Sequence, residues 1–260
     1  MSTSLVHTDV ADGVFTLTLD APDTGNALDV AMTNAVANAL ERANAMPDVH
    51  CVLIRSSGRH FCTGGNVKDM ARGTDLMAGT AAEVQHRLRA GLHRITRALH
   101  GLEVPSVAAV NGAAVGAGFD LALMCDVRIA AQSARFAESF LRLGLVSGIG
   151  GAWFLTRIVG VAKAMELTLT SEFITAETAH ELRIVSRVVP DEDLDQECLA
   201  LARTVAANPP QALRMAKRLV RESAESGLPA ALEMAASMQA ILLCGDEHRS
   251  RVQQFLAARN

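Results

Sequence analysis

Apolar residues follow two different spacings along the chain. In residues 14–19 they alternate with polar ones, which predicts a β-strand. From residue 28 to residue 43 they recur at helical spacing, which predicts a helix with Asp29 as its N-terminal cap. Short apolar runs predict four more strands, at residues 51–54, 106–110, 127–130 and 184–189.

The spacing changes along the rest of the chain. Residues 68–82 have weak periodicity and several small residues, so we expect a mobile loop that gives way to a helix over 82–99. After Pro190 the pattern is helical throughout, with predicted helices at residues 194–207, 211–223, 230–243 and 248–258. Strands that alternate with helices predict an α/β fold with a parallel sheet, followed here by a helical tail.

Composition narrows the class of protein. The chain has 260 residues, half of them apolar, which is enough for one large domain. A net charge of −4, 3% aromatic residues and no tyrosine argue against a nucleic-acid partner. The five cysteines are scattered, and the sequence has no signal peptide and no membrane span. We therefore expect a cytoplasmic protein with reduced thiols and no membrane partner.

Two glycine-rich segments carry the strongest functional signal. They are residues 61–66 (FCTGGN) and 111–120 (NGAAVGAGFD), and each follows an apolar strand-like run. Small residues allow backbone to approach backbone or ligand closely and leave N–H groups available. The second segment leads into a helix, whose N-terminus favours developing negative charge. If the two segments converge, they form an oxyanion hole.

Nucleotide-binding, hydrolase and metal sites fit the sequence less well than an oxyanion hole. The glycines lack the GxGxxG order of dinucleotide-binding loops, and neither a Walker A loop nor a GxSxG elbow is present. The eight histidines show no metal-ligand spacing, so we expect no metal. Cys62, inside the first segment, is interpreted as a small buried apolar residue.

Two acidic residues are candidates for proton transfer. Asp120 begins the helix after the second glycine-rich segment among apolar neighbours, and it could equally serve only to complement the helix dipole. Glu138 follows eighteen residues later and could approach the same cavity, or be an ordinary capping or surface acid. The pattern alone leaves both alternatives open.

These motifs together resemble the crotonase (enoyl-CoA hydratase/isomerase) family. The resemblance rests on Asn26-Ala27-Leu28, residues 61–70 (FCTGGNVKDM), residues 105–126 (PSVAAVNGAAVGAGFDLALMCD) and Gly150-Gly151, which fall in family order. It implies a ββα spiral core over residues 1–195 that holds an acyl-CoA site. It also implies a helical region over 196–260 that covers the site and forms a homotrimer or a dimer of trimers.

The resemblance also assigns roles to residues. It implies an enzyme that stabilises the enolate of an acyl-CoA thioester with the amides of Gly65 and Ala117. Coenzyme A is part of the substrate, and no other cofactor is expected. The positions that match the coenzyme A site are Thr63, Gly64, Lys68 and Gly116, with Arg259 as a possible basic residue near the nucleotide.

The chain departs from the family pattern at the acids. Asp120 aligns with the first of the two glutamates of the hydratases and is one methylene shorter, and Phe140 aligns with the second. Ser147-Gly148-Ile149 stands where other members carry an acid. Three functions stay open: a hydratase or isomerase in which Asp120 moves the proton with help from Glu138 or water; a hydrolase or retro-Claisen C–C lyase; and a non-catalytic acyl-CoA-binding protein.

Overall fold

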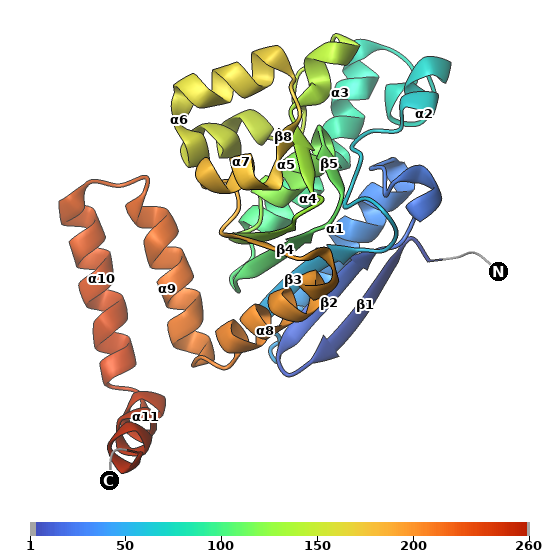
Figure 1. Ribbon diagram of the computed structural model, residues 1–260. Helices are drawn as coiled ribbons and strands as arrows, with labels where there is room; N and C mark the ends of the chain where they lie inside the picture. The colour runs from blue at the N-terminus through green and yellow to red at the C-terminus, as the bar shows by residue number, and fades with distance from the viewer. Residues whose placement is uncertain (1–3, 259–260) are drawn as a thin grey trace.

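A six-stranded sheet forms the centre of the molecule (Figure 1). The computed structural model describes residues 4–258. The antiparallel pair β1–β2 lies at one edge of the sheet, and all the other neighbours are parallel, as the alternation of strands and helices predicted. In spatial order the strands are β1 (Val6–Ala11), β2 (Val14–Leu19), β3 (Cys51–Ser56), β4 (Ser106–Val110), β6 (Val127–Ala131) and β9 (Arg187–Val189).

Strand β1 was not predicted from the sequence. It is an edge strand with mostly exposed or half-buried residues, so it lacks the apolar alternation of a half-buried strand. Its position is set by a two-residue turn at Asp12 and Gly13, whose φ angles are 53° and 75°. Positive φ at both central residues is typical of the tight hairpin turn that matches the twist of a sheet.

Helices cover both faces of the sheet. On one face, α1 (Val30–Ala45) and α4 (Leu92–His100) bury apolar side chains in the main core. On the other face, α8 (Leu194–Ala206) buries Leu194, Cys198 and Ala202 against strand residues that include Val107 and Ile129. The division predicted at residues 195/196 therefore falls within a helix that packs on the sheet.

A second, smaller sheet lies beside the first. It consists of β5 (Ala113–Val115), β7 (Arg135–Ala137) and β8 (Ile174–Thr175), with β5 and β7 parallel and β8 antiparallel to β7. Strands of two or three residues are too short to give a periodic signal, so none of the three was predicted from the sequence. This sheet carries the second glycine-rich segment, because β5 ends at Val115, directly before Gly116.

The loop prediction for residues 68–82 is wrong in part. Residues Val67–Arg72 form helix α2, and Asp75–Met77 form a single 3₁₀ turn, η2. The Asn66 side chain caps α2 by accepting a hydrogen bond from the Lys68 amide at 3.0 Å, and Gly73 ends it in the left-handed conformation. The helix predicted over 82–99 is divided by Gly91 into α3 (Ala81–Ala90) and α4.

The remaining elements complete the core around the glycine-rich segments. They are η1 (Pro22–Thr24), α5 (Ala117–Leu123), η3 (Ser139–Leu143), α6 (Gly151–Thr170), α7 (Ala176–Glu181) and η4 (Asp191–Asp193). Helix α5 begins at the second glycine-rich segment and is buried at every residue. Its start is therefore held in place by the core.

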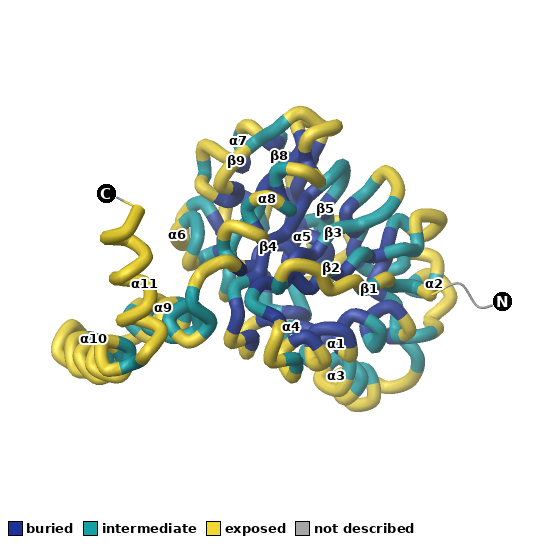
Figure 2. Tube along the Cα trace, turned by 90° about the horizontal axis from the view of Figure 1, so that it is seen from below, coloured by how far each residue is buried: buried dark blue, intermediate teal, exposed yellow. Residues whose placement is uncertain are grey.

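Three helices end the chain, and the last two of them extend away from the core. The three are α9 (Pro210–Ser223), α10 (Leu228–Leu243) and α11 (Asp246–Ala257), in agreement with the helices predicted there. Figures 1 and 2 show α10 and α11 as a projecting arm that is mostly exposed. Within residues 4–258 no single helix is long and apolar enough to cross a membrane; α10 and α11 reach that length only as a pair bent by 72°.

Helix α9 is attached to the core by a buried lysine. The Lys217 side chain is 7% exposed, and its ammonium donates hydrogen bonds to the Val104 carbonyl at 2.8 Å and to the Asp126 carboxylate at 2.7 Å. The same carboxylate oxygen accepts hydrogen bonds from the amide and hydroxyl of Ser106, at 2.7 and 2.9 Å. The segment between β4 and β6 is thereby joined to α9.

Candidate active site

The two glycine-rich segments lie against each other, as predicted. Cys62 forms a parallel bridge with Ala114, and its carbonyl accepts a hydrogen bond from the Val115 amide at 3.0 Å. Gly118 lies so close that a Cβ there would be 2.0 Å from the Cys62 carbonyl oxygen. Only glycine allows this approach of helix α5 to the first segment.

Two backbone amides without protein partners lie at this contact. A Cβ on Gly64 would be 3.2 Å from the Ala117 nitrogen, so the residue before Gly65 adjoins the start of α5. Within residues 4–258, neither the Gly65 amide nor the Ala117 amide donates a hydrogen bond to a protein acceptor. Ala117 is the first residue of α5, where helix geometry leaves the N–H unpaired and the dipole is positive.

Asn26 fixes the first segment from behind. It is fully buried with φ at 56°, and its side-chain amide donates to the carbonyls of Ser57 and His60 at 3.1 and 2.9 Å. The Cys62 thiol donates to the Asn26 carbonyl at 3.1 Å. Burial raises the pKa of Cys62 to about 12, so the thiol stays neutral, in keeping with its interpretation as a small buried residue.

Asp120 and Glu138 are buried together behind this contact. Their residues are 0% and 3% exposed, and their side chains interact. Burial raises the pKa of Asp120 to about 6, and burial together with the Asp120 charge raises the pKa of Glu138 to about 10. Hydrogen bonds from Glu138, Ser147 and the Gly151 amide act in the opposite direction on the pKa of Asp120.

The pair carries one proton at neutral pH. The Asp120 Oδ1 and Glu138 Oε1 atoms are buried, and neither accepts a hydrogen bond from an amine, amide or hydroxyl donor of the described residues. If both carboxylates were ionised, these two oxygens would lack donors and the charges would repel, whereas one proton in the pair allows the two side chains to hydrogen-bond with each other. The larger rise in pKa at Glu138 favours Asp120 as the ionised member of the pair.

Ser147 and Gly151 complete the surroundings of Asp120. The Ser147 hydroxyl donates to Asp120 Oδ2 at 2.7 Å and accepts from the Gly151 amide at 2.9 Å. A Cβ on Gly151 would be 1.7 Å from Asp120 Oδ1, so glycine is required at the start of α6. From the sequence, Ser147 stands only at a place where other family members carry an acid, and no role was predicted for it.

Phe140 lies beside the second glycine-rich segment. A Cβ on Gly116 would be 3.6 Å from the Phe140 ring and 3.6 Å from the Ser139 hydroxyl. Gly116 itself has φ at 52° and donates its amide to the Ala137 carbonyl at 2.8 Å. An aromatic ring therefore stands where the resemblance places a second glutamate.

The other predicted coenzyme A contacts are spread more widely. The Thr63 hydroxyl donates to the Gly25 carbonyl at 3.2 Å, which ties the first segment to the loop before α1. Lys68 is exposed in the first turn of α2, two residues after the end of the same segment. Arg259 lies outside the described residues. The structure thus brings Gly64 to the contact between the segments, holds Thr63 against Gly25, and leaves Lys68 exposed two residues after the first segment.

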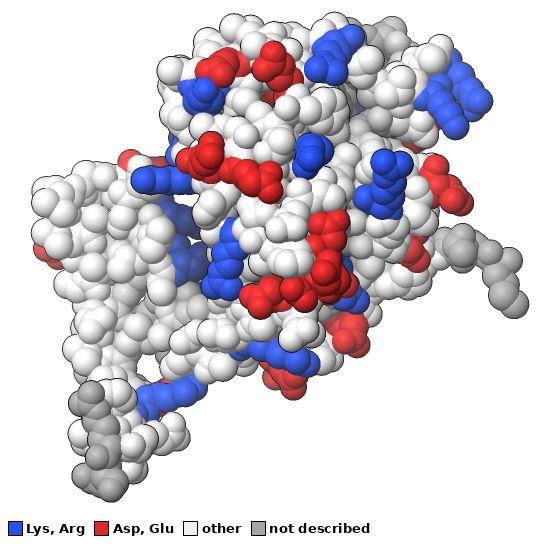
Figure 3. Space-filling view, in the orientation of Figure 1, with Lys and Arg blue, Asp and Glu red and all other residues white. Residues whose placement is uncertain are grey.

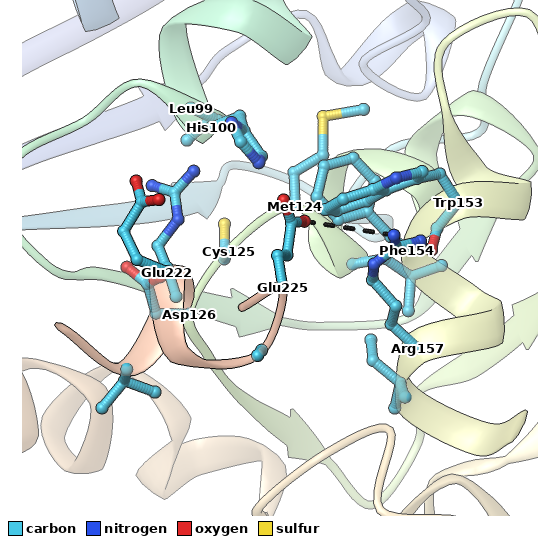
Figure 4. A pocket seen from close by; sticks show the side chains of 15 residues that line it. Leu99, His100, Met124, Cys125, Asp126, Trp153, Phe154, Arg157, Glu222 and Glu225 are labelled. Carbon is cyan, nitrogen blue, oxygen red and sulfur yellow. Dashed lines mark hydrogen bonds and ion pairs between the residues drawn. The ribbon is translucent and has the colours of Figure 1, made fainter. Parts of the chain in front are cut away.

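One cavity lies beside the glycine-rich contact, and a second lies away from it. A cavity of about 20 Å³ opens beside Gly65 and is lined by residues that include Leu28 and Met70. A cavity of about 420 Å³ lies between α4, α6 and the end of α9 (Figure 4), where the Arg157 guanidinium stacks 3.6 Å from the Trp153 ring. Residues 123–126 line this second cavity, so it lies at the far end of α5 from Ala117.

Metal ligands do not gather at either place. Among residues 4–258, no group of three or more His, Cys, Asp or Glu side chains is arranged to hold a metal ion.

The fold and the glycine-rich contact define a protein of the crotonase fold. A putative enoyl-CoA hydratase/isomerase from Mycobacterium abscessus superposes with a TM-score of 0.92 at 33% identity, covering 97% of this chain and 96% of that one. A probable enoyl-CoA hydratase from Rhodobacter capsulatus is 36% identical over 260 residues, 100% of this chain and 97% of the relative. The 1,2-epoxyphenylacetyl-CoA isomerase of Escherichia coli is 35% identical, covering 96% of this chain and 95% of that protein.

A family model described as enoyl-CoA hydratase/isomerase matches residues 9–260. The chain belongs to this family, and it is an enzyme of the hydratase/isomerase type. The resemblance seen in the glycine-rich motifs is thereby confirmed, together with the fold it implied.

Proposed function

We propose that this enzyme binds an acyl-CoA thioester and stabilises its enolate with the amides of Gly65 and Ala117. The observation that carries the proposal is the pair of unpaired N–H groups where the glycine-rich segments meet, one of them at a helix N-terminus. Fixed donors aimed at a developing oxyanion lower the barrier most when they need no reorganisation. The buried contact at Gly118 supplies that rigidity.

Asp120 is the proposed proton carrier. It is the ionised member of the buried pair, with Glu138 protonated beside it. Because Phe140 stands in the place of a second glutamate, one carboxylate performs both the removal and the return of the proton. One base that removes a proton and returns it elsewhere on the same acyl group fits isomerisation better than hydration, which needs a second group to hold water.

Product analysis on a panel of acyl-CoA thioesters tests this function. We expect a double bond or a proton to move to another position within the acyl group. Mass spectrometry and NMR of the products detect this change. Free coenzyme A or a cleaved acyl product from β-keto substrates would instead identify a hydrolase or a retro-Claisen lyase. Measurable coenzyme A affinity without any product would identify a binding protein and refute the enzymatic proposal.

The pH dependence follows from the raised pKa of Asp120. Because the base must be ionised, we expect the rate to fall as the pH drops through about 6. Stability changes in the opposite direction. The pKa of Asp120 is 3.8 in the unfolded chain and about 6 in the folded protein, so the folded state binds this proton more tightly. The contribution of Asp120 to the free energy of unfolding therefore decreases as the pH rises from about 4 to about 6. Rate–pH profiles and thermal unfolding from pH 4 to 8 measure both, with Asp120→Asn as the control that lacks the stability effect.

The position of Phe140 gives a gain-of-function test. Phe140→Glu places a carboxylate beside Gly116, where it can hold a water molecule against the acyl group. We expect hydration of crotonyl-CoA to rise at least about tenfold, a modest part of the 10²–10⁴ typical of a positioned acid or base. Phe140→Gln, which has the same length and no charge, is the control. A folded Glu variant without added hydration would contradict the assignment.

We further propose that Lys68, Thr63, Gly64 and Gly116 contribute to coenzyme A binding. Lys68 offers an exposed positive charge two residues after the first segment, suited to a phosphate. The three other residues belong to the segments whose backbone adjoins the unpaired amides. Substitution of Lys68 by Ala is therefore expected to weaken coenzyme A binding without altering the rate at saturation.

The projecting helices support the proposal of a homotrimer or a dimer of trimers. Leu228, Leu232 and Ile241 of α10 are 71%, 58% and 53% exposed, and the α10 part of the projecting arm is largely uncharged in Figure 3. Exposed apolar faces of this kind mark association surfaces. We expect Leu232→Glu to reduce the mass measured by light scattering to that of a monomer, whereas Glu233→Gln leaves it unchanged. An unchanged mass for Leu232→Glu would contradict the assignment of this face.

A further inference from the structure

The proposed base has no direct access to the outside of the molecule. Asp120 is 0% exposed, and its shorter side chain withdraws the carboxyl by one methylene compared with a glutamate. The Ser147 hydroxyl donates a hydrogen bond to it at 2.7 Å, Glu138 is paired with it, and Gly151 lies against it with its amide donating to Ser147. Glu138 and Gly151 are themselves buried, and only Ser147 is partly exposed. A proton that leaves Asp120 by a hydrogen bond toward the outside therefore passes through Ser147.

The Ser147 hydroxyl is held in the geometry that a relay requires. It donates to Asp120 Oδ2 at 2.7 Å while the Gly151 amide donates to it at 2.9 Å. Its loop is fixed from α4, where the His93 ring donates to the Gly148 carbonyl at 2.9 Å and Thr96 donates to the Ile149 carbonyl at 2.7 Å. A hydroxyl oxygen has a further lone pair, which no donor of the described residues uses, and Ser147 itself is partly exposed.

We propose that Ser147 conducts the proton between the buried Asp120 carboxylate and the acyl group of the substrate. The inference rests on the proposed enolate chemistry. As the C–H bond breaks, its proton passes to Ser147 Oγ, and the hydroxyl proton moves to Asp120 Oδ2. The electron pair of the C–H bond enters the enolate, and Asp120 becomes the neutral acid. Reversal at another carbon returns the proton and completes an isomerisation.

The start of helix α6 assists this transfer. The Gly151 amide is directed at Ser147 Oγ, which gains partial negative charge as its proton moves toward Asp120. A donor at a helix N-terminus stabilises such charge. Glu138 remains protonated throughout and stabilises the carboxylate form of Asp120 by donating to it.

The test measures α-hydrogen exchange of butyryl-CoA in D₂O, because exchange requires only proton removal and enolate stabilisation. We expect Ser147→Ala to slow exchange by about 10²-fold, within the range of a lost proton-transfer group. Ser147→Thr, which keeps the hydroxyl, is expected to stay within about tenfold of the unsubstituted enzyme. Thermal unfolding of both variants controls for folding.

A double-mutant cycle separates conduction from a merely structural role. If Ser147 is the route to Asp120, then Asp120→Asn, Ser147→Ala and the double variant share one residual rate. Full exchange in Ser147→Ala, or losses that multiply in the double variant, would overturn the relay while Asp120 keeps its role. Absence of exchange in the unsubstituted enzyme would refute the proposed function itself.

Discussion

Asp120→Asn is expected to abolish turnover while leaving the protein folded and able to bind coenzyme A. The substitution keeps the size of the side chain and removes the only charge of the buried pair, so the base is lost and the amides of the oxyanion hole stay in place. We expect the rate on the best substrate of the acyl-CoA panel to fall by about 10²–10⁴, the contribution of a positioned acid or base.

Activity and stability should separate in this variant. An ionised carboxylate buried with a raised pKa destabilises the folded state at neutral pH, so its replacement by a neutral amide is expected to preserve or increase the free energy of unfolding. The measurements are steady-state kinetics, coenzyme A titration and denaturant unfolding at pH 8. Asp48→Asn, at an exposed position, is the matched control. Unchanged turnover in Asp120→Asn would remove this residue from the mechanism.

Gly118→Ala is expected to cause the largest combined loss of stability and activity. The added methyl would lie 2.0 Å from the Cys62 carbonyl oxygen and 2.6 Å from its carbon, and both are backbone atoms. Neither can yield without breaking the 3.0 Å hydrogen bond between Val115 and Cys62. Overpacking of this kind destabilises by about 1–3 kcal/mol, and we expect a value near or above the upper end.

The loss of activity has the same origin. When α5 moves away from the first segment, the distance between the Gly65 and Ala117 amides increases, and loss of one oxyanion donor reduces rates by about 10²–10³. Denaturant unfolding and α-hydrogen exchange measure the two effects in one preparation. Gly227→Ala serves as control, because its Cβ would meet nothing closer than 3.9 Å and its φ of −75° suits any residue. Equal stability of the two variants would contradict the argument.

The part of the site predicted from sequence is the part with a local signal. Gly64 and Gly118 stand where backbone meets backbone, so the sequence there admits almost no other residue. Asp120 follows directly on the same motif. Ser147, by contrast, contacts Asp120 across 27 residues, and a single small hydroxyl in a loop leaves no periodic pattern. Such a contact becomes visible only when the loop before α6 is placed over α5.

The fold shows a similar division. Strands β2, β3 and β4 are half or fully buried, and their apolar runs were sufficient to predict them. Strand β1 is mostly exposed, and its turn at Asp12 and Gly13 is the only local signal. Helix α2 is too short for periodicity, although Asn66 and Gly73 mark its two ends.

The bond between Lys217 and Asp126 has a consequence for how the molecule opens. It joins α9 to the segment that carries Ala117 and Asp120, whereas α10 and α11 have no comparable buried ion pair to the core among the described residues. Cooperative opening follows buried contacts, so the arm can detach beyond α9 in a low-energy fluctuation. Detachment of α9 itself would expose Asp126, at the end of the segment that carries the Ala117 amide. Partial unfolding of the tail and loss of the site are thus separate events, divided near Gly227.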